Sequence, residues 1–307
     1  MKIITITINP AYDIHYYIDD FKSNNEYYCN DRSKHAAGKG INISKALSVN
    51  GIDSTAFIIT GKRNSSDYIE QLKSFEHIKC EYLEIDGDIR ENITIHSKSG
   101  ETKICQEEND VRFEHITELF SMIRKIVDDK TYVVFSGRIP KGIDCELLIN
   151  ELLKLKESGA NLIVDTSSFT YNQIKQISPW LIKPNVPEFI NLTGIKEFDI
   201  SDVKTLLMEK FDFCNVLLSL GKDGALIYFD KQILLSKAPE IKPKSTIGAG
   251  DSMIAGFLSS YTITNDISKA LKCAVAYGSA KCLSEGTNPP ITQNIELLMK
   301  DIIITKM

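Results

Sequence analysis

The sequence predicts an α/β fold in which helices cover both faces of a mostly parallel sheet. Short runs rich in isoleucine and valine are continuously apolar rather than alternating, as in strands that are buried on both faces. Segments of helical period separate these runs, and that alternation indicates a doubly wound arrangement. With 307 residues, the chain is long enough for one large domain or two ordinary ones.

The first half of the chain supplies three of the expected strands. The first strand is expected at 2–8, where KIITITI is apolar or β-branched, and a helix follows at 40–51. The next strand is expected at 54–60. A helix at 115–129 then precedes a strand at 131–137, where TYVVFSG ends in a glycine.

The second half continues the alternation. A helix is expected at 145–159 and a strand at 160–166, followed by a helix at 202–211 and a strand at 215–221. The apolar residues of 252–261, SMIAGFLSSY, also recur at helical spacing, so a further helix is expected there.

Two regions, 12–35 and 88–107, break this pattern. Both alternate polar with β-branched or aromatic residues, and KSGE at 98–101 is a hairpin turn, as in an antiparallel sheet with one solvated face. We expect them to form one small β subdomain, suited to act as a lid over a site at the carboxyl ends of the strands. The alternative is a pair of hairpins without a function.

Composition and charge exclude several classes of protein. The formal net charge is −5, with 36 basic and 41 acidic residues interspersed, so nucleic acid is not an expected partner. Seven scattered cysteines without a C-x-x-C pair predict neither a disulfide framework nor a zinc site, and a reducing cytoplasm fits best. No signal peptide or apolar run of membrane-spanning length is present, so we expect a cytoplasmic protein that does not bind membranes.

Common catalytic motifs are missing from the sequence. It contains neither the P-loop pattern G-x-x-x-x-G-K-[ST] nor the dinucleotide pattern G-x-G-x-x-G. It also lacks H-E-x-x-H and G-x-S-x-G, which excludes the usual metalloprotease and α/β-hydrolase sites.

The stretch GAGD at 248–251 places small residues and a carboxylate before the expected helix. The backbone N–H groups of Ala249, Gly250 and Asp251 are expected to point outward without partners, where the helix dipole favours an anion. Asp251 alone could be an ordinary N-cap. An N-cap residue, however, does not require glycine and alanine before it. The close approach of a bulky anion to the backbone does require such small residues.

A second cluster of small residues, HAAGKGINISKAL, covers 35–47. Small side chains here would let a ligand lie against the backbone, and the amide of Asn42 could meet a hydroxyl group. The alternative is a tight loop that closes the β region.

Together, these motifs resemble the PfkB family of carbohydrate kinases. AGKGINIS and STIGAGDSMIAGFL match the two family signatures, and NPAYD, SGRIPKG, DTSS, LIKPNVPEF and SLGKDGAL follow the order found in 1-phosphofructokinases and tagatose-6-phosphate kinases. The resemblance covers nearly the whole chain. It implies a single domain over 1–307, a ribokinase-like three-layer sandwich with a β lid, and the use of ATP and Mg²⁺.

The resemblance also implies roles for individual residues. Asp251 would be the catalytic base, framed by Gly248, Ala249 and Gly250. ATP would be bound by Lys183, Asn185, Glu188, Ser219, Gly221 and Gly224, with Asn185 and Glu188 also holding the metal. The sugar phosphate would be bound by Asp13, Gly38, Lys39, Asn42, Arg90 and Arg138. Without the resemblance, Asn185 and Glu188 could merely start a helix after Pro187.

Departures from the family pattern concern the acceptor. Ala37, Ile89 and Arg138 replace the usual residues of three motifs, and Tyr28 stands where phosphosugar members often carry arginine. The expected reaction is phosphorylation of fructose 1-phosphate or tagatose 6-phosphate to a bisphosphate, by a homodimer that pairs through its lids. A kinase of an unphosphorylated sugar or nucleoside, and a non-catalytic sugar-phosphate sensor, remain alternatives.

Overall fold

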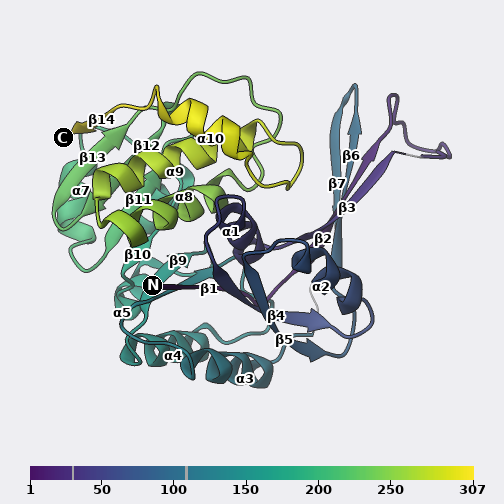
Figure 1. Ribbon diagram of the computed structural model, residues 1–307, viewed down its shortest axis with the longest axis horizontal. Helices are drawn as coiled ribbons and strands as arrows, with labels where there is room; N and C mark the ends of the chain where they lie inside the picture. The colour runs from purple at the N-terminus through teal and green to yellow at the C-terminus, as the bar shows by residue number, and fades with distance from the viewer. Residues whose placement is uncertain (30, 108–109) are drawn as a thin grey trace.

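The computed structural model describes residues 1–29, 31–107 and 110–307. A central sheet carries helices on both faces, and a smaller sheet extends away from this body (Figure 1). The strands of the central sheet are β1 (Lys2–Thr7), β4 (Ser54–Gly61), β5 (Ile78–Ile85), β8 (Thr131–Ser136), β9 (Asn161–Asp165), β10 (Leu181–Ile182), β11 (Asn215–Ser219), β12 (Ala225–Phe229), β13 (Gln232–Ser236) and β14 (Ile304–Lys306).

The central sheet is mostly parallel, which confirms the predicted fold class. Its ten strands lie in the order β14-β13-β12-β11-β10-β9-β8-β1-β4-β5. Neighbours from β11 to β5 pair in parallel, whereas β12, β13 and β14 add an antiparallel edge. Since side chains alternate between the two faces of a strand, β1 buries Ile3 on one face and Ile4 on the other.

Helices cover both faces of the central sheet. One face packs against α3 (Phe113–Arg124), α4 (Cys145–Glu157), α5 (Tyr171–Ile177), α6 (Val186–Thr193) and α7 (Val203–Lys210). The other packs against α1 (Lys39–Ser48), α2 (Ser65–Lys73), α8 (Ala249–Thr264), α9 (Ile267–Cys282) and α10 (Thr292–Met299). None of the helices in the described ranges is long and apolar enough to span a bilayer.

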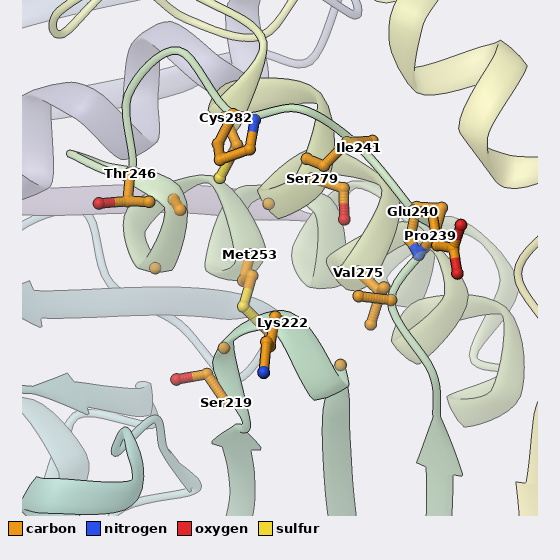
Figure 2. A pocket seen from close by; sticks show the side chains of 17 residues that line it. Ser219, Lys222, Pro239, Glu240, Ile241, Thr246, Met253, Val275, Ser279 and Cys282 are labelled. Carbon is orange, nitrogen blue, oxygen red and sulfur yellow. The ribbon is translucent and has the colours of Figure 1, made fainter.

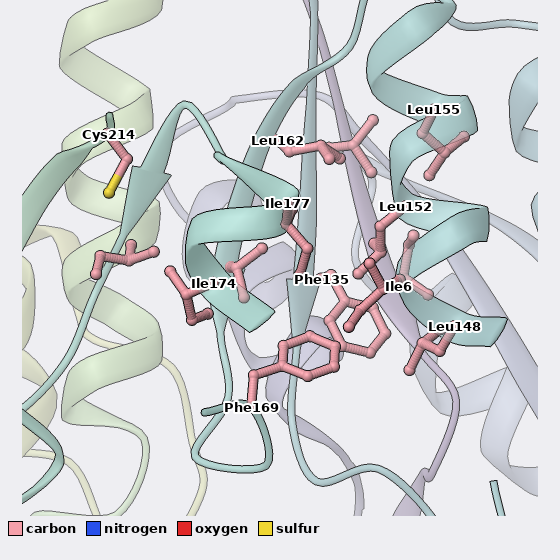
Figure 3. Packing of buried hydrophobic residues seen from close by; sticks show 14 of the residues in the cluster. Ile6, Phe135, Leu148, Leu152, Leu155, Leu162, Phe169, Ile174, Ile177 and Cys214 are labelled. Carbon is pink, nitrogen blue, oxygen red and sulfur yellow. The ribbon is translucent and has the colours of Figure 1, made fainter. Parts of the chain in front are cut away.

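The apolar residues that the sequence pattern identifies fill the space between these layers. On the α4 side, Leu148, Leu152 and Leu155 recur at helical spacing and pack against Ile6 and Phe135 from two adjacent strands (Figure 3). All five side chains are almost completely buried. Each such side chain contributes about 1.5–3 kcal/mol relative to an exposed position.

Several elements end earlier than the sequence predicts. The strand expected at 215–221 stops at Ser219, because Gly221 and Gly224 take positive φ angles of 62° and 106° in a tight turn. The helix expected at 115–129 ends at Arg124. Such ends depend on local turn geometry, which apolar periodicity does not report.

The smaller sheet contains β3 (Arg32–Ala37), β2 (Ala11–Tyr17), β6 (Arg90–Ser97) and β7 (Gly100–Cys105), in that order. It stands apart from the layered body (Figure 1), and all six residues of β7 are exposed. Each of the two irregular regions forms an antiparallel hairpin, but β2 and β6 pair in parallel, so the expectation of a wholly antiparallel sheet was wrong. The reason is that β2 and β6 follow shortly after β1 and β5, two strands that run in the same direction, so that their carboxyl ends lie at the same end of the central sheet.

Candidate active site

The start of α8 contains the GAGD stretch. Gly248 is the N-cap residue with a φ of 76°, and its carbonyl oxygen accepts a 2.9 Å bond from the N–H of Ser252. The N–H of Ala249 donates to Thr246 at 3.2 Å, so the prediction that this amide is free was wrong. Over the described residues, the N–H groups of Gly250 and Asp251 make no hydrogen bond. These two amides, at the positive end of the helix, remain available to an anion.

Asp251 is buried in the first turn of α8 and is not the N-cap. Asp251 is 5% exposed, and its Oδ2 accepts a 2.9 Å hydrogen bond from Nδ2 of Asn42 on α1. Burial, together with the negative charge of Asp165, raises the pKa of Asp251 to about 6. A carboxylate with that pKa is ionised at neutral pH and can still accept a proton readily.

Asp165 lies at the end of β9 and joins the elements around Asp251. It is 2% exposed, and its two carboxylate oxygens each lie 3.2 Å from a lysine Nζ, that of Lys39 on α1 and that of Lys183 after β10. Ser136 donates a further 2.9 Å bond. Burial would raise the pKa of Asp165, but the two lysines outweigh burial and hold it below its usual value.

Asp165 and Ser136 belong to the motifs DTSS and SGRIPKG but were assigned no role from the sequence. A signal was available, because each side chain ends a predicted buried strand, and ligands bind where the carboxyl ends of parallel strands meet. The missing information was the pairing of Asp165 with Lys39 and Lys183, which are 126 and 18 positions away in the sequence.

Lys183 lies directly against the bare backbone of α8. A methyl group placed on Gly250 would lie 2.9 Å from Nζ of Lys183, so any larger residue at 250 would displace the lysine. Because Gly250 has no side chain, the Lys183 ammonium can lie close to the free N–H group of Gly250.

Asn185 and Glu188 form a reciprocal N-terminal cap on α6. Oδ1 of Asn185 accepts from the N–H of Glu188 at 2.9 Å, and Oε2 of Glu188 accepts from the N–H of Asn185 at 2.9 Å. The two residues start a helix, as the alternative interpretation expected, although the helix begins at Val186 and includes Pro187. This cap uses one of the two carboxylate oxygens of Glu188.

A cavity of about 600 Å³ lies beside the start of α8. Ser219, Gly221 and Gly224 line it together with Ala249 and Gly250. Figure 2 shows that Met253 of α8 and Val275 of α9 also reach this cavity. The structure thus brings the predicted nucleotide-binding segment against the GAGD turn.

The segment 238–243 also lines this cavity, and the sequence predicted no role for it. It contributes Ala238, Pro239, Glu240, Ile241 and Pro243. An apolar wall with a few polar groups is typical of sites for a flat organic ring. The only sequence signal is a pair of prolines in a loop, which does not distinguish a binding wall from a connection.

Gly38 positions the start of α1 close to the end of β1. It adopts a φ of 143°, and a methyl group on it would lie 2.7 Å from Cγ2 of Thr7. Its carbonyl oxygen accepts from the N–H of Asn42 at 2.8 Å. This tight junction directs Lys39 and Asn42 toward Asp165 and Asp251, respectively.

Asp13 and Arg90 lie in one hydrogen-bonded chain at the base of the smaller sheet. Nδ2 of Asn92 donates to Asp13 at 3.0 Å, and Nη1 of Arg90 donates to Asn92 at 2.7 Å. Nε of Arg90 also donates to Asn9 at 2.9 Å. The parallel register of β2 and β6, which aligns Asp13 with Asn92, creates this contact, so the sequence could not reveal it.

Arg138 and Tyr28 are both exposed. Arg138 lies on the loop after β8. Tyr28 is 89% exposed, and its hydroxyl group donates to Glu26 at 2.9 Å. The role of Arg138 in binding a phosphorylated acceptor stays a prediction.

The arrangement can hold an anion and accept a proton at one place. Two free amides, the helix dipole and the Lys183 ammonium favour negative charge at the start of α8. The Asp251 carboxylate, in the first turn of the same helix, is a nearby group that can accept a proton. Because the backbone fixes their relative positions, little reorganisation is needed for a reaction that develops charge.

Comparison with known proteins gives consistent matches along the chain. The sequence profile described as pfkB family carbohydrate kinase matches residues 4–294. A tagatose-6-phosphate kinase of Staphylococcus epidermidis is 28% identical, over 99% of this chain and 100% of that protein. A 1-phosphofructokinase of Borreliella burgdorferi is 31% identical over 92% of each chain. Phosphofructokinase-2 from Escherichia coli, solved in complex with potassium, has the same fold, with a TM-score of 0.89 over 98% of both chains at 23% identity.

Proposed function

The chain belongs to the pfkB family of carbohydrate kinases, and we propose that it transfers a phosphoryl group from ATP to a ketohexose phosphate. The product is a bisphosphate. The acceptor is fructose 1-phosphate, phosphorylated at O6, or tagatose 6-phosphate, phosphorylated at O1. The observation that carries the proposal is the buried Asp251 carboxylate beside two free amides and a 600 Å³ cavity.

The donor site is proposed to be the cavity beside α8. Its apolar wall, which includes Ile241, Met253 and Val275, suits a purine ring. The glycines at 221 and 224 let the backbone approach the nucleoside closely. The phosphates would then extend toward Gly250 and Lys183, where positive charge is concentrated.

Mg²⁺ is proposed to bind near Asn185 and Glu188. The donor set fits a hard cation, because Glu188 uses only one carboxylate oxygen in its cap, and Mg²⁺ needs few protein ligands when phosphates and waters complete its shell. Within the described residues, no group of three acidic, histidine or cysteine side chains could hold a metal alone, so phosphate oxygens would be needed. The cation supplies charge neutralisation at the phosphates.

Asp251 is proposed to act as the general base. The acceptor hydroxyl would give its proton to the Asp251 carboxylate as its oxygen bonds to the γ-phosphorus of ATP. The bond from that phosphorus to the bridging oxygen breaks, and its electron pair leaves with ADP. The amides of Gly250 and Asp251 would hold the charge on the transferred group, and Lys183 would assist them.

The acceptor side is proposed to include Asp13, Gly38, Lys39, Asn42 and Arg90. Asp13 offers carboxylate oxygens that paired sugar hydroxyls need as acceptors. Arg90 keeps its guanidinium at the base of the smaller sheet through Asn9 and Asn92, where it would meet the phosphate that the sugar already carries. Arg138 would contribute a second positive charge from the loop after β8.

The smaller sheet is proposed to act as a lid and as the contact between two subunits. It stands away from the body, its strands carry Asp13 and Arg90, and β7 is exposed along its length (Figure 1). Closure over the acceptor would exclude water and prevent hydrolysis of ATP. Light scattering of the purified protein would reveal whether it is a dimer.

A coupled assay that follows ADP formation tests the proposal. It would compare fructose 1-phosphate, tagatose 6-phosphate, fructose 6-phosphate and fructose at equal concentration with Mg²⁺ and ATP. We expect one of the first two substrates to give the highest kcat/KM. Activity with none of the four, under conditions in which ATP binds, would contradict the proposal.

One observation favours a second candidate, a kinase of an unphosphorylated sugar. Tyr28 occupies a lid position where phosphosugar members often carry a basic residue, and it is 89% exposed. The same assay separates the candidates, because higher kcat/KM with fructose than with the sugar phosphates would support the second one.

A further inference from the structure

Lys281, near the end of α9, is a buried lysine that the proposed reaction does not yet use. It is only 2% exposed, and its Nζ donates a 2.8 Å hydrogen bond to the carbonyl oxygen of Gly286. In the described part of the chain, no carboxylate oxygen lies within 4.0 Å of this ammonium group. A buried charge without an ion pair is costly, so its retention needs a reason.

The side chain of Lys281 reaches the turn that begins α8. A methyl group placed on Gly248 would lie 3.4 Å from Cε of Lys281, 3.8 Å from Oδ2 of Asp251 and 3.9 Å from Nδ2 of Asn42. The lysine, the proposed base and its amide donor therefore converge on the space beside Gly248. Burial lowers the pKa of Lys281, whereas the neighbouring Asp251 carboxylate favours the charged lysine.

Lys281 also holds the loop between α9 and α10 near the smaller sheet. Gly286, which accepts its hydrogen bond, has a φ of 51°, and a methyl group there would lie 2.9 Å from Nε2 of His15 on β2. The lysine therefore has two separable features, a hydrogen bond from Nζ that fixes this loop and a positive charge at the end of a side chain whose Cε lies against Gly248.

We propose that Lys281 is a positioning residue of phosphoryl transfer, whose ammonium supplies a fixed positive charge behind Gly248. This charge adds to those of Lys39 and Lys183, which favour the ionised Asp251 against the opposing charge of Asp165, and to the positive end of α8, which faces the transferred group. The inference rests on the proposed function, because it assigns to Lys281 an effect on the base of that reaction. A lysine suits this task, since its ammonium is a compact point charge.

Three substitutions separate the charge from the hydrogen bond. Lys281→Met removes both, Lys281→Gln keeps a donor for Gly286 without the charge, and Lys281→Arg keeps the charge. We expect Lys281→Met and Lys281→Gln to lower kcat by about tenfold to a hundredfold, with KM for ATP within about twofold of the wild-type value. Lys281→Arg should keep most of the wild-type kcat.

The pH profile supplies a result that a purely structural role would not produce. Without the positive charge, the pKa of Asp251 should rise, so the acid limb of kcat/KM should move upward by about half to one pH unit in Lys281→Met and Lys281→Gln but not in Lys281→Arg. Lys210→Met is the matched control, because Nζ of Lys210 donates a 2.7 Å bond to the carbonyl oxygen of Thr193. This control should leave kcat and the acid limb unchanged.

A titration of the substrate-free protein distinguishes failure of this inference from failure of the proposed function. Carbon-13 NMR of labelled aspartate, with the Asp251 signal assigned by its loss in Asp251→Asn, reports the same pKa without turnover. An upward shift in Lys281→Gln supports the inference even if none of the sugars is phosphorylated. An unchanged Asp251 pKa in Lys281→Gln, or full rescue of kcat by glutamine, would overturn it.

Discussion

The start of α8 and the base of the smaller sheet present their functional groups in opposite ways. At α8, Asp251 is buried and accepts a hydrogen bond from Asn42, while the helix backbone fixes the free amides and the buried Asp165 holds Lys183. At the smaller sheet, Asp13 and Arg90 depend on a chain of side-chain hydrogen bonds between two strands that stand away from the body. The comparison indicates that the groups proposed for phosphoryl transfer are fixed by the fold, whereas the groups proposed for acceptor recognition are held by side chains that can change.

The largest expected effect comes from Asp251→Asn, which removes the proposed base and keeps the size of the side chain. We expect kcat to fall by at least about a thousandfold, with the affinity for ATP, measured by calorimetry, nearly unchanged. Folding raises the pKa of this carboxyl from 3.8 to about 6. Its contribution to the free energy of unfolding is therefore present below pH 3.8 and lost as the pH rises to about 6.

At neutral pH, the ionised Asp251 therefore destabilises the folded protein, and Asp251→Asn should melt at the same or a higher temperature than the wild type. Retained activity in this variant would contradict the assignment of the base. A lower melting temperature would indicate that the carboxylate is needed for folding.

Asp165→Asn is expected to have the next largest effect, because it breaks the link between the two sides of the site. Lys39 and Lys183 would lose their shared partner, and removal of one member of a buried ion pair typically costs about 3–5 kcal/mol. We expect kcat to fall about a hundredfold and the melting temperature to drop, as measured by calorimetry. Asp128→Asn, which breaks an exposed pair with Lys2, is the control and should change kcat little. A normal kcat in Asp165→Asn would show that the site does not need this link.

Arg90→Ala tests the other region. We expect KM for the phosphorylated acceptor to rise about tenfold to a hundredfold while KM for ATP changes less than twofold, because the proposed contact of Arg90 is with the acceptor phosphate. Arg63→Ala, which removes an exposed arginine paired with Asp88, is the matched control. Equal changes in both KM values would exclude a specific role of Arg90 in acceptor binding.

The smallest effect is expected from pH in the wild type. Because the pKa of Asp251 is about 6, kcat/KM should be nearly constant above pH 7 and fall about tenfold between pH 7 and pH 5. Calorimetry of ATP binding over the same range separates loss of the base from weaker substrate binding. A flat profile down to pH 5 would mean that Asp251 titrates lower than its environment indicates.

Five strands of the central sheet (β1, β4, β8, β9 and β11) and five of its helices (α1, α3, α4, α7 and α8) were predictable from the sequence, because continuous apolar runs and helical periodicity report burial directly. The strands at 2–8 and 131–137 appear within one residue of their expected ends. The strands β5, β10, β13 and β14 were not predicted; β10, for example, has only two residues, which carry no periodicity. The parallel pairing of β2 with β6 was also missed, because it depends on where β1 and β5 end in space.

For the site, the sequence reports single positions better than contacts. The bare backbone before α8 and the carboxylate of Asp251 were readable, because glycine and alanine at a helix start indicate that another group approaches the backbone closely. The hydrogen bond from the N–H of Ala249 to Thr246 could not be predicted from the sequence, since it depends on the φ of Gly248. Lys281 gave no signal either, because a lysine near the end of a helix usually faces solvent.

The exposed edge strand β7 has a consequence for how the protein behaves in solution. A strand with one unpaired side presents a row of backbone donors and acceptors on which another chain can form a sheet. Its charged residues, Glu101 and Lys103, oppose indiscriminate pairing, while Ile104 offers an apolar contact. Storage at high salt would screen these charges, so aggregation should increase with ionic strength and start at this edge.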